Sequence, residues 1–74
     1  MAKKEGSGVY RVTEVIGTST NSWEDAARNA VKTAGATLRD LRIAEVTKLD
    51  VRIDDDGKIA QFRARLSLSF KYEG

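Results

Sequence analysis

The chain has 74 residues and a formal net charge of +2, from 13 lysines and arginines against 11 aspartates and glutamates. It contains no cysteine and no histidine, which excludes a disulfide framework, zinc–thiolate sites and the commonest general base. A chain this short forms one domain with a small core, so we expect partner subunits to support it.

The charge distribution does not favour a nucleic acid or a membrane as partner. Basic and acidic residues are interspersed, whereas a nucleic-acid-binding protein gathers its basic residues on one face. No apolar stretch approaches the roughly 20 residues of a membrane span, and no signal peptide opens the sequence. We therefore expect a cytoplasmic protein that binds neither nucleic acids nor membranes.

The first predicted element is a strand that follows a polar leader. Residues 1–8 contain two glycines and no periodic pattern, which predicts a disordered leader before a single domain at residues 9–74. Residues 9–16 (VYRVTEVI) are rich in β-branched and aromatic side chains, as strands are. The run of turn-forming residues 17–21 predicts the end of this strand.

A helix is predicted next, with Ser22 as its N-cap. The serine hydroxyl can accept from a free backbone N–H, and Glu24 and Asp25 lie favourably at the positive end of the helix dipole. Apolar side chains then recur at helical spacing, and many of them are alanines that allow close packing on a sheet. These positions are Trp23, Ala27, Ala30, Val31, Ala34, Leu38 and Leu41.

A long hairpin is predicted to complete the chain. From Ile43 the pattern alternates, and strict alternation puts Ile43 and Glu45 on one face with Leu49 and Val51. Residues 54–57 (DDDG) are typical of a hairpin turn. The third strand has the clearest alternation, and its apolar side consists of Ala60, Phe62, Ala64, Leu66, Leu68, Phe70 and Tyr72.

The order of these elements predicts an α+β fold of β-α-β-β type, in which a three-stranded antiparallel sheet carries one helix. A single helix covers only one face of such a sheet. The other face has charged residues but also apolar ones, and this leftover apolar surface favours self-association.

Five short segments, in this order and spacing, resemble the dodecin family over residues 9–72. They are Val9-Tyr10-Arg11-Val12, Gly17-Thr18-Ser19, Ser22-Trp23-Glu24-Asp25-Ala26, Ala44-Glu45-Val46 and Ser69-Phe70-Lys71-Tyr72. The resemblance implies a sheet partly wrapped around its helix and twelve identical subunits in a hollow shell of tetrahedral symmetry. It also implies storage or buffering of flavin, either riboflavin or FMN, which the family holds in pairs between subunits.

The two residues that contact flavin in the family are replaced in this chain. Flavin-binding dodecins stack the ring on a tryptophan in a Trp-x-Glu pattern, and the matching segment here is Ile43-Ala44-Glu45. They bond the ring edge with a glutamine after an aromatic residue, and the match here is Phe62-Arg63. The chain thus resembles a subgroup without the stacking tryptophan, and isoleucine cannot supply the roughly 0.5–1.5 kcal/mol of an aromatic stack. Trp23 is no substitute, because we expect it to pack the helix onto the sheet.

The candidate ligand-binding residues are Ile43, Glu45, Gln61, Arg63 and Arg65. Ile43 offers an apolar wall, and Gln61 shares a strand face with Arg63, where it could offer an amide. Arg63 and Arg65 could attract an anionic group. The favoured interpretation is that the two arginines form salt bridges between subunits, with Glu45 or Asp50.

Three functional hypotheses follow. The first is a homododecameric shell that stores flavin weakly or holds another flat or anionic small molecule. The second is the same shell with a divalent cation as ligand, on residues that the sequence does not identify, or with a cavity that has lost flavin altogether. The acidic turn 54–56 matches no calcium-loop spacing. The third is a structural or interaction module. No nucleophile has a predicted base beside it, so we do not expect an enzyme.

Overall fold

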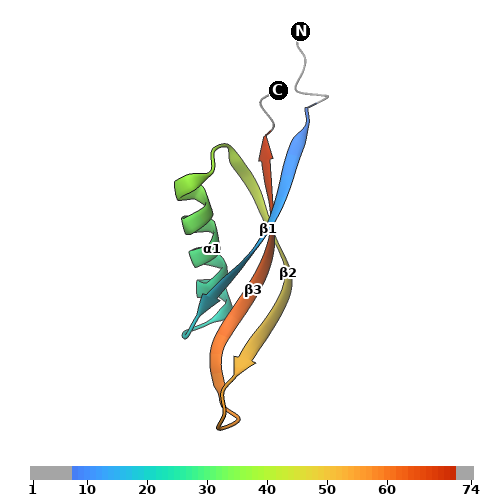
Figure 1. Ribbon diagram of the computed structural model, residues 1–74. Helices are drawn as coiled ribbons and strands as arrows, with labels where there is room; N and C mark the ends of the chain where they lie inside the picture. The colour runs from blue at the N-terminus through green and yellow to red at the C-terminus, as the bar shows by residue number, and fades with distance from the viewer. Residues whose placement is uncertain (1–7, 72–74) are drawn as a thin grey trace.

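The computed structural model describes residues 8–71 and has the predicted β-α-β-β order. The elements are β1 (Tyr10–Ser19), α1 (Trp23–Thr37), β2 (Leu41–Ile53) and β3 (Ile59–Lys71). The three strands form one antiparallel sheet in the order β1-β3-β2, with α1 against one face (Figure 1). Nearly all of the predicted leader, and Tyr72 of the predicted third strand, lie outside the described residues.

The central strand β3 carries the core, as its alternation predicts. Ala64, Leu66, Leu68 and Phe70 are all buried and face α1, while the residues between them face away. The helix meets them with three buried alanines one turn apart: Ala26, Ala30 and Ala34. Because alanine side chains are short, the helix axis can lie close to the sheet.

The helix begins where the sequence predicts and ends earlier. The Ser22 side chain accepts a 3.0 Å hydrogen bond from the Asp25 backbone N–H. The helix stops at Thr37, since Leu38 is extended and Asp40 adopts a positive φ of 63° that turns the chain back. Extending the helix pattern to Leu41 was therefore wrong, because Leu41 begins β2 and packs on the core from the sheet side.

β1 runs further than predicted, through Gly17 to Ser19. Gly17 is needed for close approach and not for a turn. A Cβ atom at Gly17 would lie 2.1 Å from the Ala26 carbonyl oxygen and 2.8 Å from the Ala30 Cβ. The residue that looks like a strand terminator is thus the point where α1 crosses β1.

β2 contains a β-bulge that changes which of its residues face the helix. The register shifts between Val46 and Lys48, which leaves Thr47 without a paired residue on β3. The predicted strict alternation is therefore wrong for the residues after Thr47, because the extra residue moves each of them to the opposite face of the sheet. The helix-facing side carries Ala44, Val46, Leu49 and Val51, and the opposite side carries Ile43, Glu45, Lys48, Asp50 and Arg52.

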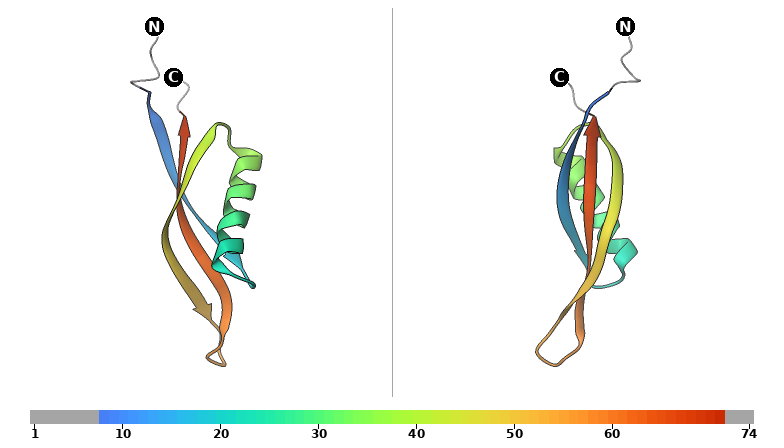
Figure 2. Two further views of the ribbon diagram at one scale, coloured as in Figure 1. Left: turned by 180° about the vertical axis from the view of Figure 1, so that it is seen from behind. Right: turned by 90° about the vertical axis from the view of Figure 1, so that its right-hand side faces the viewer.

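The helix leaves one flank of the sheet uncovered. It packs mainly against β1 and β3 and scarcely against β2. The β2–β3 hairpin also extends well beyond the end of α1 (Figure 2), so that the molecule measures 59 × 20 × 16 Å. Within residues 8–71 no helix is long and apolar enough to cross a bilayer.

Candidate ligand-binding face

The structure brings all five candidate residues to the side of the sheet that faces away from α1, here called the outer face. Gln61, Arg63 and Arg65 alternate with the core residues of β3 and so point to this side. Ile43 pairs with Ser69 and Glu45 pairs with Ser67, which puts them on the same side. The five residues share this face across two strands but are spread along it, since Gln61 lies eight positions along β3 from Ser69, the residue that pairs with Ile43.

Arg63, at the position of the family's glutamine, is engaged by Asp50. Its Nε donates to Asp50 Oδ1 at 2.7 Å and its Nη2 donates to Oδ2 at 3.0 Å. This two-point hydrogen bond lowers the pKa of the Asp50 carboxyl and raises the pKa of the Arg63 guanidinium. Asp50 is one of the predicted partners, and this bridge forms within one chain, while the salt bridges between subunits stay a prediction.

The other polar candidates have weaker partners. Gln61 accepts a hydrogen bond through Oε1 from Arg52 Nε at 3.1 Å, so its amide is oriented by a neighbour on the same face. Arg65 lies 3.8 Å from a carboxylate oxygen of Glu14, which is a long and solvent-exposed ion pair. Both contacts can be exchanged for a ligand at little cost.

Two carboxylates flank β3 in a single row of the outer face. Glu14 of β1 and Glu45 of β2 both pair with Ser67, from opposite sides. Their backbones are therefore two strand spacings apart, about 10 Å. Among the residues that the structure describes, no cluster of three or more acidic side chains could hold a metal ion.

The next row of the outer face is apolar. Val12 and Ile43 both pair with Ser69, and both are more than half exposed, at 58% and 55%. Sequence reasoning did not include Val12 and Glu14 in the site. The alternation of β1 puts them on one face, but only the pairing of β1 with β3 shows which face that is.

Trp23 lies on the helix-facing side, as predicted. Its ring packs edge-on against Phe62, with centroids 5.1 Å apart and planes at 74°. Its indole Nε1 donates to the Asp50 carbonyl oxygen at 2.9 Å. Trp23 thus fixes the start of α1 to β2 and β3, and the sheet separates it from the outer face.

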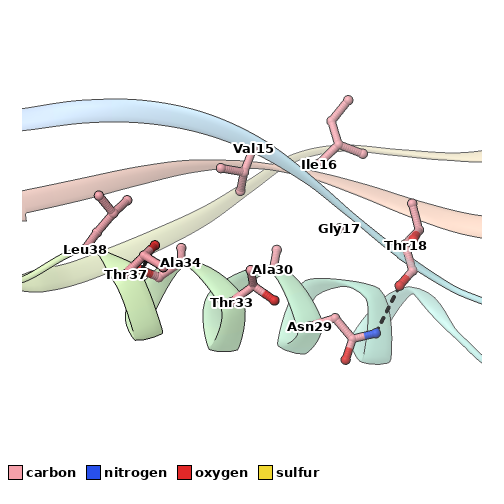
Figure 3. A pocket seen from close by; sticks show the side chains of 10 residues that line it. All are labelled: Val15, Ile16, Gly17, Thr18, Asn29, Ala30, Thr33, Ala34, Thr37 and Leu38. Atoms are coloured by element: carbon pink, nitrogen blue, oxygen red, sulfur yellow. Dashed lines mark hydrogen bonds between the residues drawn. The ribbon is translucent and has the colours of Figure 1, made fainter.

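A concave surface lies between β1 and α1 and is here called the β1–α1 groove (Figure 3). It is an open groove of about 530 Å³, and one hydrogen bond of 3.0 Å, from Asn29 Nδ2 to the Thr18 carbonyl, crosses its end. No charged side chain lines it. Its lining consists of Val15, Ile16, Gly17, Thr18, Asn29, Ala30, Thr33, Ala34, Thr37 and Leu38.

Comparisons with known proteins agree with this architecture. The family model Dodecin matches residues 9–73. The chain is 46% identical over 63 residues to calcium dodecin of Mycobacterium tuberculosis, a match that covers 85% of this chain and 87% of that protein. A solved structure of that calcium-chelating antigen, described as having a novel calcium-binding site, superimposes with a TM-score of 0.78 at 45% identity, covering 88% and 91% of the two chains.

A second solved structure, dodecin from Streptomyces coelicolor, superimposes with a TM-score of 0.84 at 44% identity. The match covers 92% of this chain and 96% of that one. The family model spans almost the whole sequence, and the identity to relatives of nearly equal length is well above 30%. The chain belongs to the dodecin family.

Proposed function

We propose that this chain assembles into a hollow cytoplasmic homododecamer that binds and stores a divalent cation, with calcium as the first candidate. The role is binding and not catalysis. The observation that carries the proposal concerns Arg63, which stands where flavin-binding dodecins carry a glutamine. The guanidinium of Arg63 is already bound to the Asp50 carboxylate, at 2.7 and 3.0 Å.

The acidic row supports a cation. Calcium takes six to eight oxygen ligands, and Glu14 and Glu45 supply carboxylates on one face of each subunit. A symmetric shell repeats this row around its axes, so that neighbouring subunits could complete the ligand set. The calcium dodecin relative, 46% identical, favours the same ligand class.

Calcium titration of the assembled particle tests the proposal. We expect calcium to raise the melting temperature, because a ligand at about 100 times its Kd adds about 2.7 kcal/mol to the stability of the folded state. Glu14→Gln and Glu45→Gln should abolish that shift. Glu24→Gln removes the same charge from the first turn of α1, away from the outer face, and should leave the shift unchanged. Calcium binding that survives both outer-face substitutions would refute the site.

Flavin or another anionic ligand is the second candidate, because Gln61, Arg63 and Arg65 share the outer face with the apolar row. Fluorescence quenching of riboflavin and FMN by the twelve-subunit particle tests it. Quenching of FMN but not of riboflavin would assign the arginines to the phosphate group. We expect the wild-type protein to quench neither strongly.

A double variant shows whether the outer face can still accept a flavin. Ile43→Trp with Arg63→Gln restores both family contacts, and a regained stack corresponds to up to about tenfold in affinity. We expect this variant to quench riboflavin more strongly than wild type. Equal quenching by the two proteins would show that the loss of flavin binding has another origin.

A further inference from the structure

We propose that the outer face carries an anion site, centred on Lys48 and Arg65, that binds the phosphate group of a small molecule or free inorganic phosphate. The site lies next to the acidic row and is separate from it. The inference goes beyond the proposed storage of a cation and does not depend on it. It rests on the strand register, which gathers four cationic side chains on this face: Lys48, Arg52, Arg63 and Arg65.

Lys48 and Arg65 form a cross-strand pair of like charges. They are register partners on β2 and β3, so their Cβ atoms lie about 5 Å apart on one exposed face. Like charges directly opposite each other in a sheet are destabilising. Arg65 has only the long contact of 3.8 Å with Glu14, and within residues 8–71 Lys48 forms no ion pair. A bound anion would turn this unfavourable pair into a favourable one.

The bulge at Thr47 brings Lys48 to this place. Val46 pairs with Leu66, and the next paired residue on β2 is Lys48, opposite Arg65. Strict alternation would have left Lys48 on the helix-facing side. The Thr47 hydroxyl donates a 3.2 Å hydrogen bond to the Arg65 carbonyl oxygen, which holds the bulge in place. Bulges re-aim side chains in this way at functional sites, and this one builds the cationic pair.

The two neighbouring rows add further hydrogen-bond donors. In the first, Arg63 uses two N–H groups on the Asp50 carboxylate, and the rest of its guanidinium stays available. In the second, Arg52 donates through Nε to Gln61 Oε1 at 3.1 Å, which leaves its terminal nitrogens and the Gln61 amide nitrogen free to donate. Asp50 is the one carboxylate in these rows and the Lys48 row, so four cations face a single negative charge.

Asp50 is the internal counter-ion with which a ligand competes. The hydrogen bond from Arg63 lowers the pKa of the Asp50 carboxyl, and the charges of Arg65 and Lys48 lower it further, so all three cations act on one point. The carboxylate has a single charge and is committed to Arg63. A phosphate group carries close to two charges and three acceptor oxygens, so it can contact Lys48 and Arg65 together.

The anion site is distinct from the apolar row of the same face. Arg65 lies four residues along β3 from Ser69, which pairs with Ile43, and four strand residues span about 13 Å. A ring packed on Ile43 would reach the site only through a linker of that length. The site therefore recognises the phosphate group itself, with or without a ring.

Binding of inorganic phosphate to the assembled particle tests the site. Equilibrium dialysis at constant ionic strength, in buffer freed of divalent cations, keeps the result independent of the calcium titration. Lys48→Gln and Arg65→Gln should each weaken phosphate binding by about tenfold. Lys32→Gln removes the same charge from an exposed position of α1 and should leave the affinity unchanged. A wild-type protein that binds no phosphate, or an affinity unchanged in both outer-face variants, would overturn the proposal.

Thermal unfolding separates a binding role of Lys48 from a structural one. Without phosphate, Lys48→Gln should unfold at the wild-type temperature or slightly above it, because the substitution removes a like-charge pair. Phosphate should then raise the melting temperature of wild type more than that of the variant. A variant that unfolds below wild type by the same amount in both buffers would show that Lys48 supports the fold, and would contradict the site.

Asp50→Asn should have the opposite effect on binding. It removes the carboxylate that competes with the ligand, so phosphate affinity should rise by about fivefold. A residue that only maintained the shape of the sheet would weaken binding when replaced. Unchanged or weaker binding would therefore refute the role of Asp50 as counter-ion.

A pair of matched ligands distinguishes the two sources of the phosphate group. Glycerol 3-phosphate carries the group as a monoester, and glycerol lacks it. Tighter binding of glycerol 3-phosphate than of inorganic phosphate would assign the site to phosphorylated small molecules, and the reverse order would assign it to the free ion. Equal binding of glycerol and glycerol 3-phosphate would exclude recognition of the phosphate group and overturn the proposal.

Discussion

The two faces of the sheet differ in how their side chains are held. On the helix-facing side, Leu66, Leu68 and Phe70 are almost completely buried against short alanine side chains. Only side chains of similar size and shape can replace them. On the outer face, ion pairs such as Arg63–Asp50 and Arg65–Glu14 remain exposed to solvent. Packing on the helix-facing side supplies the stability of the subunit, whereas the exposed ion pairs of the outer face hold their side chains only weakly.

The largest expected effect comes from a cavity in the helix-facing side. Leu68→Ala should lower the free energy of unfolding by about 2–5 kcal/mol, because the Leu68 side chain on β3 is fully buried under α1. Urea denaturation at fixed subunit concentration measures it. The control Ile43→Ala, on the exposed outer face, should change stability by only about 0.5 kcal/mol. Equal losses would mean that a neighbouring subunit buries the outer face as fully as α1 buries the other.

A smaller loss should follow from adding one methyl group where α1 crosses β1. Gly17→Ala puts a Cβ 2.1 Å from the Ala26 carbonyl oxygen, so the helix must move off the sheet, at a cost of about 1–3 kcal/mol. Gly35→Ala makes the same chemical change on α1 with nothing within 4 Å, and should stabilise the protein by about 0.5–1 kcal/mol. A neutral Gly17→Ala would show that the crossing is loosely packed.

Alternation and capping signals were sufficient to predict most of the fold. The alternating pattern of β3 identified the core, and Ser22 with its two acidic neighbours located the start of α1. Local patterns failed where a contact distant in sequence decides the structure. Gly17 reads as a turn former until Ala26 is known to lie against it, and the Asp40 turn that ends the helix region has no strong local signal.

The sequence correctly predicted which β3 residues share a face, but it predicted their neighbours on β1 and β2 incompletely. The spacing of Gln61, Arg63 and Arg65 puts them together in any strand. Their neighbours depend on register, which the bulge at Thr47 sets for β2 and the pairing with β3 sets for β1. Glu14 and Val12 were missed for that reason, and so was the pairing of Arg63 with Asp50 of the same chain.

The N-cap of α1 should have an effect of intermediate size. Ser22→Ala removes the hydroxyl that accepts from the Asp25 N–H, which costs about 1 kcal/mol. Thermal unfolding measures the loss. Ser22→Asp keeps an acceptor at the cap and should retain most of the stability. If both variants lost the same amount, the hydroxyl would act through something other than the cap.

The smallest expected effect lies on the outer face and depends on pH. The hydrogen bond from Arg63 lowers the pKa of Asp50 in the folded protein, so this pair contributes stability above the ordinary pKa of an aspartate and loses it as the pH falls through the lowered value. Asp50→Asn should therefore reduce the urea midpoint slightly at pH 7, and this deficit should disappear as the pH falls through the lowered pKa of Asp50, because the wild-type side chain then becomes neutral as well. Asp55→Asn removes the same charge from the hairpin turn and serves as the control. A deficit of Asp50→Asn that persisted unchanged in acid would show that the loss does not come from the charge of the ion pair with Arg63.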